Sequence, residues 1–121
     1  MSWDDFTLFL TSDLLAREGE LLDDLPFINR HEVVKHIIGE RIIARFNRIS
    51  EPLVEIANPQ LFAETALCLN LAMVLRENST RRDDIFAVRA EFYQRRFEEE
   101  LERAFAAVKF DEAESGVELV R

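Results

Sequence analysis

The sequence predicts an all-α protein: a small helical bundle with three main helices, an extra N-terminal helical segment and an extended C-terminal tail. Apolar residues recur at intervals of three and four through most of the chain, which is the spacing of one helix face. Capping signals precede the main segments. No repeat or low-complexity linker divides the chain, so we interpret residues 1–121 as a single domain, for which this length is usual.

The first main helix is expected over residues 29–49. Asn29 can cap the free amides at its start, and Glu32, three residues on, can reach back to the amide of Asn29. Apolar residues then follow at helical spacing and form one wide stripe along the segment. The candidate core residues of this stripe are Ile38 and Ile42.

The second main helix is expected over residues 59–78, with Asn58 as its cap. Pro59 would occupy the first helical position, where its missing amide costs nothing. Apolar residues leave this segment little polar surface. We therefore expect it to be the central helix, packed on most sides, with Leu67 and Leu71 in its core.

The third main helix is expected over residues 83–108, after a short polar break. Thr80 or Asp83 can serve as its cap. Apolar residues spaced by three and four form a stripe close to a heptad pattern, and this stripe should face the second helix. The candidate core residues of the stripe are Tyr93, Phe97 and Leu101.

Charges on the outer face of the third helix have the spacing of ion pairs. Glu91 precedes Arg95, and Glu99 precedes Arg103, each by four residues. Pairs in this order stabilise a helix by about 0.2 to 0.5 kcal/mol each. We interpret them as stabilising a solvent-exposed face, with contact to a specific partner as the alternative.

The N-terminal segment, residues 1–28, is less regular. Residues 11–13 can cap a short helix, which Gly19 interrupts and Pro26 closes. Before that helix, apolar residues alternate with polar or smaller ones, a pattern that fits either a strand or an arm. These alternating residues are Trp3, Phe6, Leu8 and Leu10.

Composition indicates a folded, soluble protein, since 48% of the residues are hydrophobic and 32% are charged. No apolar stretch reaches the roughly 20 residues that span a bilayer, and the N-terminus lacks the basic flank of a secretory signal. We therefore expect no membrane segment, and folding in the cytoplasm. The net charge of −9 disfavours nonspecific attraction to nucleic acid. Cys68, the one cysteine, lies in an apolar run and is expected to be a buried hydrophobe.

Residues equipped for catalysis are few. His31 and His36 resemble the HExxH zinc motif, but they are five residues apart and would point about 140° away from each other around a helix. The sequence has no P-loop, no GxSxG and no GxGxxG. The helix after Pro59 is too apolar to read DNA as part of a helix-turn-helix. We predict that the protein is not an enzyme and uses no cofactor or metal.

Four stretches carry a resemblance to a known family. They are residues 10–18 (LTSDLLARE), 61–67 (LFAETAL), 93–101 (YQRRFEEEL), and 110–111 (FD) followed by Gly116 and Val117. In the order and length of these stretches and in their pattern of residue types, most of the chain resembles the head-to-tail connector (adaptor) proteins of tailed bacteriophages. This resemblance concerns the arrangement of elements, because no single stretch is diagnostic.

The resemblance implies a structural virion protein that forms a homo-oligomeric ring, usually twelvefold, beneath the capsid portal. One end of the ring would bind the portal protein, the other would receive the stopper or tail protein, and DNA would pass through as cargo. The protein would be made in the bacterial cytoplasm and reside in the head-to-tail connector region of the virion. The alternative is a cytoplasmic helical protein–protein interaction module that binds one partner helix in a groove.

The C-terminal tail, residues 109–121, carries apolar residues around an acidic stretch at 111–114. An apolar chain end suits an extended segment that adds to the sheet edge of another chain or lies in its groove. The alternative is a strand folded back on its own bundle. The resemblance implies docking on the portal, and the candidate docking residues are Phe110, Val117, Leu119 and Val120.

Overall fold

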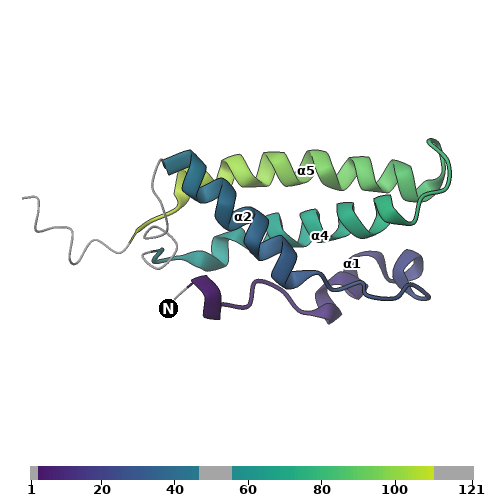
Figure 1. Cartoon of the computed structure of the whole chain (residues 1–121), viewed down its shortest axis with the longest axis horizontal. Coiled ribbons are helices and arrows are strands. Elements are labelled where there is room, and N and C mark those ends of the chain that lie inside the picture. Colours follow the sequence, from purple (N-terminus) through teal and green to yellow (C-terminus); the bar gives the residue numbers. More distant parts are fainter. Residues whose placement is uncertain (1–2, 47–55, 111–121) are drawn as a thin grey trace, which may run out of the picture.

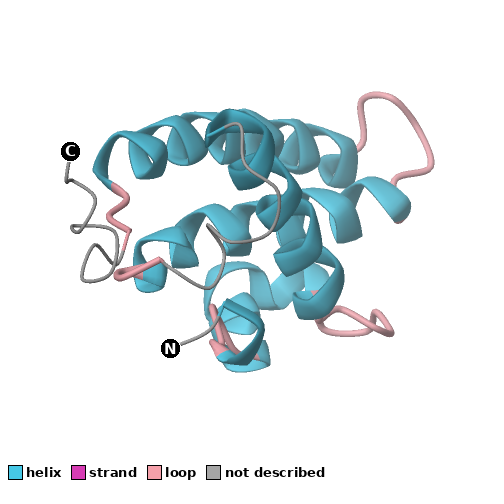
Figure 2. Ribbon diagram, turned by 60° about the vertical axis from the view of Figure 1, so that its left-hand side comes forward, coloured by secondary structure: helices cyan, strands magenta, loops and turns pink. Residues whose placement is uncertain are grey.

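A computed structural model describes residues 3–46 and 56–110, and within these ranges every regular element is a helix (Figures 1 and 2). The prediction of an all-α bundle is therefore confirmed. The elements are the 3-10 turn η1 (Trp3–Asp5), α1 (Thr11–Leu22), α2 (His31–Phe46), the 3-10 turn η2 (Pro59–Phe62), α4 (Ala63–Glu77) and α5 (Ile85–Ala107).

Helices α4 and α5 form a long hairpin, which α1 and α2 cover from different sides (Figure 1). Arg89 of α5 bonds to Glu18 of α1, whereas Glu98 of α5 bonds to Arg41 of α2. Arg89 and Glu98 are nine residues apart, which is a rotation of about 180° around the helix. The side chains of α1 and α2 therefore meet opposite sides of α5.

The core lies around α4, in which most residues are buried. An amphipathic helix buries one stripe, whereas α4 is enclosed by α1, α2 and α5 and buries most of its circumference. The predicted core is confirmed at every candidate position, with exposed fractions between 0% and 6%. Those residues are Ile38, Ile42, Leu67, Leu71, Tyr93, Phe97 and Leu101.

The start of α5 differs from the prediction. Asp84 is the cap, in place of Thr80 or Asp83, and its Oδ1 accepts the amide of Ala87 at 2.7 Å. Its Oδ2 accepts the amides of Thr80 at 2.6 Å and Arg81 at 3.0 Å. One carboxylate thus satisfies the helix start and closes the preceding loop, which neither predicted residue does. These bonds lower the pKa of Asp84 to about 2.

The start of α2 confirms half of the predicted capping box. The Oδ1 atom of Asn29 accepts the amide of His31 at 2.9 Å. Glu32, however, lies 3.1 Å from the ring of His31 instead of reaching back, so that part was wrong. The amide of Arg30 bonds to Asn70 of α4 at 2.6 Å, so a buried side chain of the central helix completes this cap.

The predicted role of Asn58 was also wrong, because its side chain does not cap the helix that follows it. Its Oδ1 accepts the amide of Lys109 at 2.8 Å, and its Nδ2 donates to the carbonyl of Ala107 at 3.2 Å. The last carbonyls of a helix have no partner within the helix, and Asn58 meets this need at the end of α5. Pro59 does begin a helical segment, the turn η2, and α4 follows at Ala63.

The N-terminal segment is an arm and not a strand. Residues 6–10 have no regular secondary structure and no strand pairing, and the consecutive residues Leu8 and Phe9 are both buried against the bundle. The indole of Trp3 donates to the carbonyl of Lys35 at 3.3 Å, and the buried amine of Lys35 donates to the carbonyl of Asp4 at 2.7 Å. These contacts fix the arm to α2. The predicted end of the first main helix at residue 49 lies outside the described residues.

Candidate interaction surfaces

The tail begins in contact with the bundle. Phe110 is half-buried, its backbone forms an antiparallel bridge with Ile56, and its ring lies 5.1 Å from the ring of Phe46. At this residue the arrangement fits the folded-back alternative. The other candidate docking residues, Val117, Leu119 and Val120, lie outside the described residues, so the docking role of the tail stays a prediction.

A row of aromatic rings crosses the end of the bundle from which the tail leaves. Trp3 meets Phe62 at 5.6 Å, Phe62 meets Phe105 at 6.3 Å, and Phe105 meets Phe46 at 5.8 Å between ring centroids. Phe110 extends the row through Phe46. Each edge-to-face pair contributes roughly 0.5–1.5 kcal/mol beyond its buried area, so this end is a rigid base for the tail.

Helix α1 is fixed to α5 by a buried carboxylate that sequence reasoning missed. Glu18 is 8% exposed, and its Oε2 accepts the Tyr93 hydroxyl at 2.5 Å and Nε of Arg89 at 3.1 Å. The backbone of Glu18 leaves the helical region, with φ −138° and ψ 44°, which turns its side chain inward just before Gly19. Burial, followed by the bond to Glu18, raises the pKa of Tyr93 to about 12.

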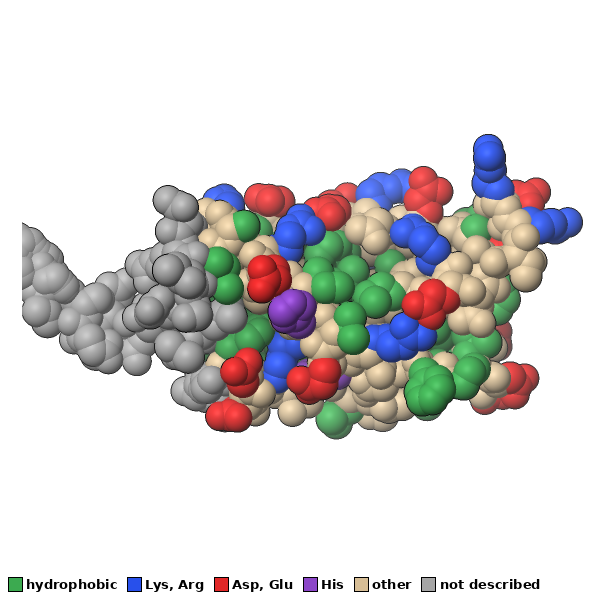
Figure 3. All heavy atoms as spheres, viewed as in Figure 1, with side chains coloured by type: hydrophobic (Ala, Val, Ile, Leu, Met, Phe, Trp, Pro, Cys, Tyr) green, Lys and Arg blue, Asp and Glu red, His purple; other side chains and the backbone are tan. Residues whose placement is uncertain are grey.

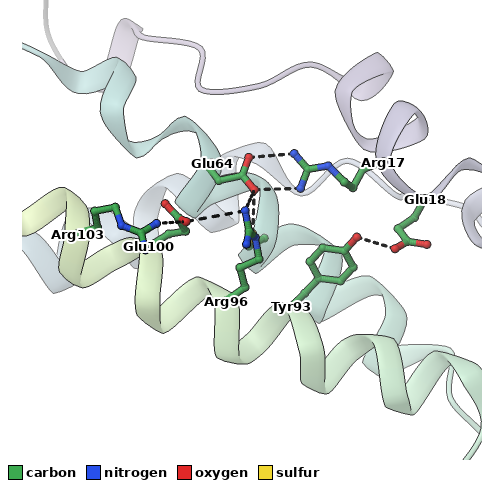
Figure 4. A network of polar contacts seen from close by, with 8 residues as sticks. Arg17, Glu18, Glu64, Tyr93, Arg96, Glu100 and Arg103 are labelled. Carbon is green, nitrogen blue, oxygen red and sulfur yellow. Dashed lines mark hydrogen bonds and ion pairs between the residues drawn. The ribbon is translucent and has the colours of Figure 1, made fainter.

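A second polar network joins α1, α4 and α5 (Figure 4). Arg17 donates to both carboxylate oxygens of Glu64, at 3.0 Å and 2.9 Å. Arg96 bonds to the same carboxylate at 3.4 Å and lies 3.9 Å from Glu100, which also pairs with Arg103. The bond from Arg17 is the largest cause of the lowered pKa of Glu64. Glu64 therefore links α4 to α1 through Arg17 and to α5 through Arg96.

The predicted ion pairs on the outer face of α5 have different outcomes. Glu91 and Arg95 pair at 4.0 Å, as expected. Arg103 pairs with Glu100 instead of Glu99, so that prediction was wrong. Glu100 lies at the edge of the core with 15% of its side chain exposed, so water screens its attraction to an arginine less than it would for a fully exposed carboxylate.

The residues first considered for chemistry have structural partners. Burial raises the pKa of Cys68 to about 12, so its thiol stays protonated and unreactive at neutral pH. Nε2 of His31 accepts the amide of Leu8 at 2.9 Å, and its Nδ1 faces Glu32. His36 is exposed. Over residues 3–46 and 56–110, no three His, Cys, Asp or Glu side chains are placed to hold a metal ion.

Shallow hollows lie on the surface of the part of the chain that the structure describes. One of about 200 Å³ lies between the N-terminal arm and α2, with Asp4, Glu32 and Glu40 on its walls. Another, of about 360 Å³, lies between α1 and the start of α4. The third, of about 590 Å³, is a wide depression beside Leu15 and Gly19. None of these three hollows has a Ser, Thr or Cys side chain on its walls.

An apolar stripe on α5 points away from the core. Ile85 is 53% exposed, Val88 is 53% exposed and Phe92 is 45% exposed, and their spacing of three and four places them on one helix face. The guanidinium of Arg89 lies 5.4 Å from the ring centroid of Phe92 and borders the stripe on the side of α1. This face was not predicted from the sequence, although Ile85, Val88 and Phe92 form a second apolar series at helical spacing, which could have indicated it.

The outward face of α2 has a different character. Val33 is 50% exposed, and His36 and Glu40 follow it at the same spacing on the solvent side. Figure 3 shows this side of the molecule, where a histidine and acidic side chains adjoin a hydrophobic area. The solvent side of α2 therefore presents one exposed apolar side chain, Val33, followed by a histidine and a carboxylate.

Comparisons with known protein families, with characterised proteins and with solved structures found no match. In the described ranges, none of the helices combines the length and the apolarity that crossing a bilayer requires. The class that the fold defines is a small all-helical bundle.

Proposed function

We propose that this protein is a structural virion protein, a head-to-tail connector (adaptor). In this role it forms a ring that joins the capsid portal to the tail or stopper and lets DNA pass. The proposal begins with the resemblance in the order and length of elements. The helical bundle, with a short helix before three longer ones, is the architecture that this resemblance implies.

The observation that carries the proposal is the separation of the two ends of the bundle. The tail leaves from one end, beside Phe110, and the loop of residues 78–84 lies at the other end (Figure 1). The 23 residues of α5 separate them by about 35 Å. An adaptor must hold two partners at once, and an elongated bundle with a rigid tail base supplies two distant contact regions.

Charge is consistent with the passage of DNA. The net charge of −9 disfavours nonspecific attraction of the chain to a DNA duplex. A ring with an acidic inner wall would keep DNA from adhering as it passes. The arginines of the α1–α4–α5 network are paired with carboxylates, which reduces their attraction for phosphate.

The second candidate is a helical interaction module that binds one partner helix. The exposed stripe of Ile85, Val88 and Phe92 favours it, because an amphipathic helix recognises such a face by the same spacing. The two candidates differ in stoichiometry: a module forms a one-to-one complex, whereas a connector adds many copies to one portal.

The test is deletion of residues 115–121, followed by mixing with the portal protein of the same virus. We expect the truncated protein to keep its helicity and thermal stability but to lose incorporation beneath the portal. Circular dichroism and sedimentation of the complex measure the two properties. Portal binding by a folded truncation at the level of the full chain would refute the docking role of the tail. Unfolding of the truncation would show that the tail belongs to the core.

A further inference from the structure

The apolar stripe on α5 is not explained by the fold of the single chain. Isolated exposed apolar residues are common on protein surfaces, but Ile85, Val88 and Phe92 form one row, each about half exposed. A row at positions i, i+3 and i+7 is the pattern by which a helix docks on another surface. The stripe therefore has the form of an interface.

Arginines surround the stripe. Arg95 is one turn beyond Phe92, with 70% of its side chain exposed, and Arg81 lies in the loop four residues before Ile85, with 74% exposed. Arg89 is 37% exposed and borders the stripe on the side of α1. Each of these arginines is paired with an acidic residue, but residues 81–96, which contain the stripe, hold five arginines against three acidic residues and are net basic in a chain whose net charge is −9. A partner surface should thus be apolar with an acidic border.

The outward face of α2 meets that description. Val33 is apolar and half exposed, and the hollow of about 200 Å³ beside it has Asp4, Glu32 and Glu40 on its walls. A hollow of this size and charge can receive a guanidinium group. Two basic side chains also line it: Lys35, which is 5% exposed and is bonded to backbone carbonyls of the arm, and His36, which is exposed and pairs with Glu40.

The two faces lie on different sides of the same molecule. The stripe adjoins Arg89 on the side of α5 that meets α1, whereas α2 meets the opposite side through Glu98. A contact between two different faces of identical chains is heterologous, and repeating it gives a closed ring when the rotation permits. In an antiparallel contact of the stripe with its own copy, Arg89, near the midpoint, would lie close to Arg89 of the second copy, and Arg95 would lie close to the basic residues 81 and 82 at its other end.

We infer that the α5 stripe of one copy binds the outward face of α2 on the next copy, with Val88 and Phe92 against Val33 and Arg95 beside the acidic hollow. This contact is the joint between neighbouring subunits of the ring. The inference rests on the proposed function and adds to it the two faces that meet between neighbouring subunits. Its occupant is a second copy of this chain.

Cysteine crosslinking tests the pairing of the faces. Cys68 is changed to Ala, and Cys is introduced in place of Val33, of Val88, or of both. We expect oxidation of the assembled double variant to give a ladder of covalent oligomers beyond the dimer, since each chain then has both halves of the joint. The two single variants should crosslink when mixed but not separately. Strong dimer formation by the Val88 variant alone would overturn the inference, because it indicates a twofold contact.

Charge and apolar substitutions give an independent readout. Phe92→Glu should reduce the assembled fraction about tenfold or more at a fixed concentration, because it places a carboxylate opposite an acidic face. Phe27→Glu is the matched control, since Phe27 is 85% exposed and belongs to neither face. Arg95→Glu should weaken assembly, and adding Glu40→Arg should restore part of it. Circular dichroism verifies that each variant remains folded.

The outcomes separate the inference from the proposed function. The masses of the assemblies formed by the wild-type chain and by each variant are measured without crosslinking, both alone and with the portal protein. Two results together would overturn the inference and leave the connector role intact. The first is that Phe92→Glu forms rings at the level of the control variant, and the second is that the double cysteine variant forms rings but gives no ladder of crosslinked oligomers. A wild-type chain that remains monomeric both alone and with the portal would overturn the connector role and the inference with it.

Discussion

The α4–α5 hairpin and helix α1 are held in the bundle by different forces. The hairpin is joined by apolar side chains such as Leu71 and Phe97, which are buried in the common core. Helix α1 adds the buried Leu14 and Leu22 but depends on Glu18 for its bond to α5. Apolar burial has no preferred direction and spreads over many contacts, whereas an ionic bond depends on a few atoms. The hairpin should therefore tolerate a polar substitution that loosens α1.

The largest effect is expected in the hairpin. Changing Leu71, which is 0% exposed, to Ala leaves a cavity in the most enclosed helix and should lower the free energy of unfolding by about 2–5 kcal/mol. Chemical denaturation measures the change. Leu10→Ala is the control, because that side chain is 59% exposed and should cost less than about 0.5 kcal/mol. A loss below about 1 kcal/mol at Leu71 would contradict the placement of α4 at the centre.

A smaller and local effect is expected at α1. Glu18→Gln removes the charge that Arg89 and Tyr93 face and should lower the free energy of unfolding by about 1–3 kcal/mol. The cost stays below that of a fully buried pair, because 37% of the Arg89 side chain is exposed to screening water. Hydrogen exchange should rise in α1 and remain unchanged in α4. Glu20→Gln, at an exposed site on the same helix, should alter neither. Equal acceleration in both helices would show that α1 is not a separate unit.

The smallest effect concerns pH and the start of α5. The pKa of Asp84 is lowered from 3.8 to about 2 in the folded chain, so its contribution to stability is complete above pH 3.8 and disappears as the pH falls through about 2. Asp84→Asn should therefore destabilise the protein at neutral pH, and the difference from wild type should shrink between pH 4 and pH 2. Asp83→Asn, whose carboxylate is 83% exposed, is the control. A difference that does not change with pH would contradict the role of the Asp84 charge.

Helical periodicity was sufficient to find the core but not the caps. The spacing of Leu67, Tyr93 and Leu101 reports which side of a helix is apolar, and each of these residues is buried. Capping depends on which polar side chain reaches an amide after the helices have packed. Asn58 satisfies the end of α5 instead of its own helix, and Asn70 completes the start of α2 from the centre of α4. Contacts between residues 40 or more apart leave no local signal.

The interaction surfaces were harder to predict than the core. Glu18 appears in the sequence as an ordinary helix-surface residue, and only Gly19 after it indicates the change of direction that buries it. Ile85 and Phe92 are apolar, as core residues are. The side of α5 that packs against α4 is, however, occupied by a different apolar series. Which of two apolar series faces inward is decided by packing. The exposed series could therefore be identified only after the helices were placed.

The most direct test of the connector role is the mass of the complex that the full chain forms with the portal protein, supported by electron microscopy. The account predicts many copies bound as a closed ring beneath one portal, with twelve expected from the resemblance. A second expectation is that DNA remains free of the ring at moderate salt. A single copy per portal, or no binding by a folded chain at high concentration, would contradict the account and favour a helical interaction module.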